Sequence, residues 1–164
     1  MDILNLQFAG SDAEKQHIIF SVGDEEFGLD VLRVQEIIRY VEPTKIPHAP
    51  EFIEGVINFR GEIIPVINLR RRFALQNTSD HDFTVIIVIE INGKTFGLTV
   101  DQVSDIISIP DDKIQPAPEF SARAGTEYLK AMGKLGNRLV LILDLDKIIS
   151  LSSQKKLEEI IEAF

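Results

Sequence analysis

The segment Asp24-Glu25-Glu26-Phe27-Gly28-Leu29-Asp30 opens a pattern that the chain uses twice. Its Phe-Gly-Leu triplet returns as Phe96-Gly97-Leu98. In both copies a β-branched run precedes the triplet, and spaced valine and isoleucine residues follow it. A unit of this length is too long for a solenoid repeat and fits a small barrel. The repeat therefore predicts two similar lobes with a groove between them.

The two copies also agree further along the chain. Pro50-Glu51-Phe52 recurs as Pro118-Glu119-Phe120, and the apolar run 63–69 corresponds to 139–145. The apolar runs are spaced more widely than the Phe-Gly-Leu triplets, so the second copy carries a longer middle loop.

The most polar stretch of the chain, 74–82, marks the predicted boundary between the lobes. We expect the chain to divide, in order, into a lead-in at 1–14, a first lobe at 15–82, a second lobe at 83–150 and a C-terminal helix at 151–164.

Short apolar runs separated by turn residues predict an all-β protein of eight to ten strands. Asn92-Gly93, between 85–91 and 94–98, fits a type I′ hairpin turn, which needs positive φ at both positions. Pro65 lacks an N–H donor, so its strand is expected at a sheet edge or a bulge.

One amphipathic helix is expected at the end of the chain. Leu157, Ile160, Ile161 and Phe164 recur at helical spacing, and Ser152-Ser153 precede them as N-cap candidates.

Composition excludes several classes of function. The 164 residues are 45% hydrophobic, which is enough for one good core or two small ones. A net charge of -9 opposes nucleic-acid binding, and Arg70-Arg71-Arg72 is interpreted as a solvated face. The chain has no cysteine and no apolar stretch of the ~20 residues that span a bilayer, so a cytoplasmic protein is expected.

No catalytic constellation is visible in the sequence. His17, His48 and His81 are isolated from one another, and Asp144-Leu145-Asp146 is interpreted as capping the turn before 147–149 rather than as a cation site. Phosphate-binding and serine-nucleophile motifs do not occur. We expect no enzyme activity, no cofactor and no metal, although a triad of residues distant in sequence would escape this search.

The ordered motifs resemble the CheW family of chemotaxis coupling proteins. The resemblance covers about 17–149 and several motifs in fixed order. The motifs are Asp24 to Asp30, Val34-Gln35-Glu36-Ile37, Pro50 to Val56, Asn58-Phe59-Arg60-Gly61, Gly97-Leu98, Val103-Ser104-Asp105, Pro116 to Phe120 and Tyr128-Leu129.

The resemblance implies two five-stranded SH3-like β-barrels in tandem and a non-catalytic adaptor function. The implied partners are a histidine autokinase, through its regulatory domain of the same fold, and the cytoplasmic hairpin tip of membrane chemoreceptors. The implied location is the cytoplasm, with recruitment to membrane-associated receptor arrays.

The resemblance also implies which residues contact partners. Arg60 is the first candidate, because a guanidinium on a tight turn offers a planar set of donors that lysine does not reproduce. Phe59 stands where the family more often has leucine. The full set is Asn58, Phe59, Arg60, Gly61, Val34, Glu36, Gly55, Val103 and Ile106.

Two alternatives stay open at this point. One is a regulatory domain of the same fold from a larger chemotaxis kinase or from a receiver-fused coupling protein. The other is a two-barrel protein that binds a small ligand between its lobes.

Overall fold

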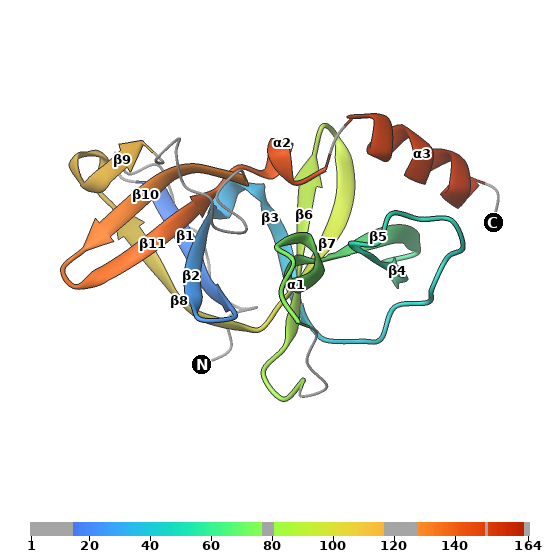
Figure 1. Cartoon of the computed structure of the whole chain (residues 1–164), viewed down its shortest axis with the longest axis horizontal. Coiled ribbons are helices and arrows are strands. Elements are labelled where there is room, and N and C mark those ends of the chain that lie inside the picture. Colours follow the sequence, from blue (N-terminus) through green and yellow to red (C-terminus); the bar gives the residue numbers. More distant parts are fainter. Residues whose placement is uncertain (1–14, 77–80, 117–127, 150, 163–164) are drawn as a thin grey trace.

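The computed structural model describes residues 15–76, 81–116, 128–149 and 151–162, and it is mostly β. Two β lobes lie side by side, and helix α3 lies beyond the second lobe (Figure 1). The lead-in at 1–14 and Phe164 fall outside the described residues. The strands are β1 (Lys15–Val22), β2 (Glu25–Asp30), β3 (Val34–Arg39), β4 (Ile53–Phe59), β5 (Glu62–Asn68), β6 (Val85–Ile91), β7 (Lys94–Val100), β8 (Gln102–Ile109), β9 (Ile114–Pro116), β10 (Leu129–Leu135) and β11 (Arg138–Leu143). The helices are α1 (Leu69–Arg72), α2 (Leu145–Ile148) and α3 (Leu151–Glu162), with 3-10 turns at Val31–Arg33 and Asp111–Lys113.

The strands form two sheets, which we call lobe A and lobe B. Lobe A has the order β8-β1-β2-β11-β10-β9, and lobe B has the order β3-β6-β7-β5-β4. The predicted fold class is confirmed: two sheets of five or six strands and a short C-terminal helix. Lobe A has a sixth strand because the three-residue β9 adds to β10.

The predicted division of the chain at 82/83 is wrong, because the two halves exchange hairpins. The hairpin β1–β2 belongs to lobe A, where β1 pairs with β8 and β2 pairs in parallel with β11. The hairpin β6–β7 belongs to lobe B, where β6 pairs with β3 and β7 pairs in parallel with β5. Each lobe therefore combines a hairpin from one repeat with the later strands of the other, and the lobes are intertwined rather than tandem.

The exchanged hairpins are apolar on both faces because each face meets a different core. Along β1, Ile18 and Phe20 join a central cluster shared by both lobes, whereas Ile19 points into the core of lobe A. Along β6, Ile87 joins the same central cluster and Ile86 points into the core of lobe B. Strands buried on both faces read as continuous apolar runs, which explains 18–20 and 85–89 in the sequence.

The glycines of the repeated Phe-Gly-Leu triplets are needed for this packing. A Cβ on Gly97 would lie 2.7 Å from Ile86 Cγ2, and one on Gly28 would lie 3.1 Å from Val140 Cγ1. Both positions face the inside of a lobe, where a neighbouring strand occupies the space that a side chain would take.

Helix α1 lies at the junction of the lobes. The guanidinium of Arg72 lies between the rings of Phe52 and Tyr128, 4.4 and 4.5 Å from their centres. Its Nε donates to the carbonyl of Ile148 at 2.5 Å. Such cation–π contacts are worth about 0.5–2 kcal/mol each. The prediction that the arginine triplet is a solvated face is therefore wrong for Arg72.

Arg70 makes a second link across the junction. Its Nε and Nη2 donate to Asp101 at 2.8 and 2.7 Å, and this bidentate pairing raises the pKa of Arg70. Asp101 Oδ2 also accepts from the backbone N–H of Gly23 at 2.8 Å, in the β1–β2 turn. Arg70 thus connects the end of β5 to the exchanged hairpin.

The sequence predicted the N-terminal cap of one helix correctly and that of another wrongly. Asp144 Oδ1 accepts from the N–H of Asp146 at 3.1 Å, so the predicted capping role is confirmed, and the capped segment is the short helix α2 rather than a turn. Helix α3 begins at Leu151, so Ser152 and Ser153 lie inside it and the predicted N-cap is wrong. Its apolar stripe packs on the central cluster, with Leu157 buried.

Pro65 was expected at a sheet edge or a bulge, and the edge is wrong, although the β4–β5 pair does contain a bulge opposite Val66 and Ile67. Its strand, β5, lies between β4 and β7 and is not an edge strand. The parallel ladder to β7 begins only at Val66, so one flank of Pro65 has no ladder partner and the missing N–H is tolerated.

Candidate functional site

The β4–β5 turn holds Arg60 at the end of lobe B. Phe59 pairs with Glu62, so Arg60 and Gly61 form a two-residue loop. Their φ angles are +52° and +85°, as a type I′ turn requires. Asn58 Oδ1 accepts from the N–H of Gly61 at 2.9 Å, and this hydrogen bond stabilises the turn.

Glu36 on β3 forms an ion pair with Arg60 Nη2. The neighbouring residue Gln35 is the extra residue of a β-bulge, because Val34 pairs with Ile89 and Glu36 pairs with Val88. The guanidinium of Arg60 also lies 5.4 Å from the centre of the Phe59 ring.

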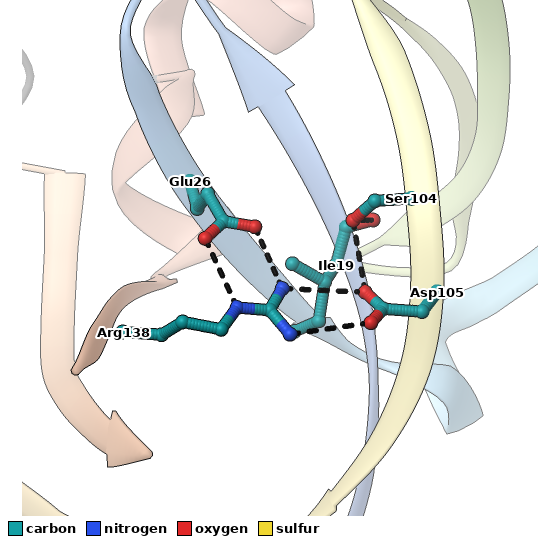
Figure 2. A network of polar contacts seen from close by, with 5 residues as sticks. All are labelled: Ile19, Glu26, Ser104, Asp105 and Arg138. Carbon is teal, nitrogen blue, oxygen red and sulfur yellow. Dashed lines mark hydrogen bonds and ion pairs between the residues drawn. The ribbon is translucent and has the colours of Figure 1, made fainter. Parts of the chain in front are cut away.

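Lobe A contains an arginine, Arg138, that is more fully paired than Arg60. Arg138 at the start of β11 donates to Glu26 at 3.2 and 2.7 Å and to Asp105 at 3.3 and 3.5 Å. Figure 2 shows its guanidinium between the two carboxylates, with Ser104 beside Asp105. Hydrogen bonds to the two carboxylates raise the pKa of Arg138, and the bond to Glu26 has the larger effect. This network ties β2, β8 and β11 together.

The internal repeat relates the carboxylates of the two sites but not their arginines. Asp105 corresponds to Glu36 in the register that aligns Phe96 with Phe27, and Ser104 is the extra residue of the β8 bulge as Gln35 is of the β3 bulge. The Ser104 hydroxyl lies 3.2 Å from the Ile19 carbonyl and 2.8 Å from Asp105 Oδ1. The repeat carried a signal for Asp105 that the sequence prediction missed.

The Arg60 and Arg138 sites differ in how many guanidinium N–H groups are left without an acceptor. The Arg138 side chain is 39% exposed and meets two carboxylates, whereas the Arg60 side chain is 74% exposed and meets one. Within the described part of the chain, no other side chain or carbonyl accepts a hydrogen bond from the Arg60 guanidinium. Arg138 is therefore part of the structure of lobe A, and Arg60 retains N–H groups for a binding partner.

The other predicted contact residues occupy different places. Val34 begins β3, just before the bulge and Glu36, and packs on the central cluster. Val103 and Ile106 lie on β8 in lobe A, where both are half-buried against the same cluster. Phe59 is only 8% exposed and belongs to the core of lobe B. The structure thus gathers 58–61 with Glu36 and leaves Val103 and Ile106 on the other lobe.

Gly55 is required by a close approach within the chain. A Cβ there would lie 2.3 Å from the carbonyl oxygen of Thr44. Thr44 and the adjacent Val56 exchange two backbone hydrogen bonds of 2.9 Å, so the loop 41–52 lies directly against β4.

The fold and the exposed Arg60 guanidinium are those of a binding protein. Among the residues that the structure describes, no three His, Cys, Asp or Glu side chains are grouped to hold a metal ion. The same residues include no helix with the length and apolarity to cross a membrane.

Comparison with known proteins places the chain among chemotaxis proteins of one family. The model of the CheW-like domain family matches residues 16–153. The chain is 43% identical over 144 residues to the chemotaxis protein CheW of Klebsiella aerogenes, covering 88% of this chain and 87% of that protein. It is 33% identical over 138 residues to CheW of Bacillus subtilis, covering 84% and 88%. The crystal structure of the scaffolding protein TtCheW from Thermoanaerobacter tengcongensis superposes with a TM-score of 0.79 at 36% identity, covering 85% of this chain and 95% of that one.

This chain belongs to the CheW-like family. It is a non-catalytic coupling scaffold of chemotaxis signalling rather than an enzyme. The alternatives of a domain from a larger kinase and of a ligand-binding barrel are not favoured by these matches.

Proposed function

We propose that this protein couples membrane chemoreceptors to a histidine autokinase through the Arg60 end of lobe B. The observation that carries the proposal is the exposed guanidinium, held on a rigid turn by one carboxylate and with donors to spare. A side chain fixed in this way loses little conformational freedom when it binds.

The proposed kinase contact is the regulatory domain of the same fold, and the proposed receptor contact is the cytoplasmic hairpin tip. Asn58, Gly61 and Glu36 shape the surface around Arg60, and Phe59 supports it from the core. Val34, Val103 and Ile106 present half-buried apolar side chains on β3 and β8, which suits the packing of a partner helix. Gly55 contributes indirectly, by holding the loop 41–52 against β4.

A scaffold without a reaction acts on a kinase only by binding the kinase's states with different affinity. The receptor state would then reach the kinase as a coupling free energy of about 1–3 kcal/mol. We place the protein in the cytoplasm, recruited to membrane-associated receptor arrays in which multiple contacts raise the effective affinity.

The Arg60→Glu variant tests this proposal. We expect its affinity for the kinase regulatory domain or the receptor fragment to fall at least about tenfold, because a charged anchor is replaced by its opposite. The measurement is calorimetric titration with each partner, followed by kinase phosphorylation with and without receptor fragment.

The control is Arg60→Asn, which keeps a residue suited to positive φ and removes the guanidinium. It should unfold at the same denaturant concentration as the parent and still lose affinity. Parent-like affinity of Arg60→Glu for both partners would remove Arg60 from the interface. Kinase activity that ignores the receptor even with the parent protein would reject the coupling role itself.

A further inference from the structure

A polar pocket lies in lobe B near Tyr40, which follows β3, and Glu54 on β4, away from the β4–β5 turn that carries Arg60. It has a volume of about 220 Å³ and opens between the loop after β3, the β5–α1 junction and the end of β7. Its lining consists of Tyr40, Glu42, Pro43, Lys45, Glu54, Asn68, Arg70, Arg71, His81, Thr84, Thr99 and Asp101.

The floor of the pocket is already satisfied by its own hydrogen bonds. Glu54 accepts from the Tyr40 hydroxyl, from Thr99 Oγ1 at 2.9 Å and from Asn68 Nδ2 at 3.3 Å. Burial and the bond to Glu54 raise the pKa of Tyr40, so its hydroxyl stays a donor. The Arg70–Asp101 pair closes a second side of the floor. These groups are fixed and have little capacity left for a ligand.

The rim of the pocket has unused donors. Lys45 has no ion pair within the described ranges, and Arg71 makes only a 3.4 Å contact from Nη1 to the Glu51 carbonyl. The ring of His81 stacks on Tyr40 with centres 4.3 Å apart and uses only Nδ1, 3.4 Å from Thr84 Oγ1. Glu42 is the rim carboxylate that opposes these groups.

We propose that this pocket binds a small anion that carries a carboxylate or phosphate group. Arg71 and Lys45 supply the charge, and the His81 ring, stacked on Tyr40, lines the pocket beside them. Charge-assisted bonds of this kind are the strongest available at such a rim, and among the described residues an anion competes there only with the 3.4 Å contact of Arg71 to the Glu51 carbonyl. Glu42 weakens the site by repulsion.

The experiment is a titration of the whole protein with sodium phosphate and, separately, with sodium succinate, followed by amide NMR shifts at low and constant ionic strength. We expect saturable shifts that centre on the pocket. Arg71→Gln and Lys45→Gln should each weaken binding about threefold or more, and Glu42→Gln should strengthen it, because the three side chains act through charge. The two anions distinguish a phosphate site from a carboxylate site.

The matched control is Arg39→Gln, which removes an exposed cation of β3 that does not line the pocket. It should leave binding unchanged. Shifts that fail to saturate by about 50 mM, or an equal loss of affinity with Arg39→Gln, would overturn the proposal, since either result describes general screening rather than a site. Because Lys45 and Glu42 are exposed, their variants are expected to fold even if Arg71→Gln does not.

Discussion

Arg60 occupies a backbone conformation that bulky residues rarely adopt. Its φ of +52° matches that of Asn92, at +51°, in the other two-residue turn with two positive φ angles. A non-glycine residue in this region costs about 1 kcal/mol, and asparagine is among the residues that tolerate it best. The turn would therefore accept asparagine, and what arginine adds at this position is its guanidinium.

His17 is a buried titratable residue on β1. Its side chain faces the inside of lobe A, the residue is 3% exposed, and Nδ1 has no partner within the described chain. Burial lowers the pKa of His17 from its ordinary value of 6.5, against the opposing effect of Asp30. The folded protein therefore holds His17 neutral at a pH where the unfolded chain takes up a proton.

The pH dependence of unfolding tests this effect. Below about pH 6.5 the unfolded state binds more protons, so the free energy of unfolding should fall by up to about 1.4 kcal/mol per pH unit until the folded pKa is reached. Urea unfolding between about pH 7.5 and about pH 5.5 should show a smaller loss for His17→Gln than for the parent. His48→Asn, at an exposed histidine, should retain the full loss. Equal losses for the parent and His17→Gln would show that His17 does not contribute.

At the scale of elements, the hairpin turns were the most predictable features. Asn92 and Gly93 have φ angles of +51° and +75°, so the predicted type I′ turn is confirmed. The capping role of Asp144 was also predicted, although for a turn rather than for helix α2. Both depend on residues that are close neighbours in the chain, and the sequence alone therefore contains all the atoms that decide them.

The Gly93→Val variant tests the turn. A β-branched residue is strained at φ +75°, although the space around Gly93 is open, so the free energy of unfolding should fall by about 1–2 kcal/mol. Denaturant unfolding measures it. Asn137→Val is the control, because Asn137 follows Gly136 in a turn of the same length and its own φ is not positive. A similar loss in both variants would mean that side-chain chemistry, not backbone conformation, is responsible.

The features that the sequence did not predict depend on distant residues. Arg72 meets Phe52 and Tyr128, which belong to two other segments of the chain, one before it and one well after it. Arg138 meets Glu26 from the far end of the sequence. A charged run without visible partners was interpreted as solvated, because no local pattern marks the rings and carboxylates that the fold brings to it. Among the proposed contact residues, only the grouping within 58–61 was local enough to predict.

At the scale of the whole molecule, the repeat predicted two lobes and misassigned their strands. Sequence similarity between 27–29 and 96–98 reports a shared local structure, and it does not report which strands pair. Exchange of the hairpins leaves each repeat's own pattern intact. For that reason the fold class was predicted correctly and the boundary at 82/83 was not.

Separate expression of the fragments 1–82 and 83–164 tests the intertwined topology. Neither fragment contains a complete sheet, because β1–β2 has its partners in the second fragment and β3–β5 have theirs in β6–β7. We expect each fragment alone to lack a cooperative unfolding transition, and a mixture of the two to regain one. Thermal unfolding followed by circular dichroism measures this. A cooperative transition in either isolated fragment would support the contiguous lobes and contradict the exchange.

The same exchange sets an order in which the lobes can close during synthesis. Every strand of lobe B lies between Val34 and Val100. The hairpin β1–β2 ends at Asp30, but β1 can pair only after β8, which begins at Gln102, has been synthesised. At about 5–20 residues per second, the ribosome needs about 4–14 s to bridge that interval. The part of the chain that is made first is thus completed last, and throughout the delay a hairpin with two apolar faces lacks its partner strands.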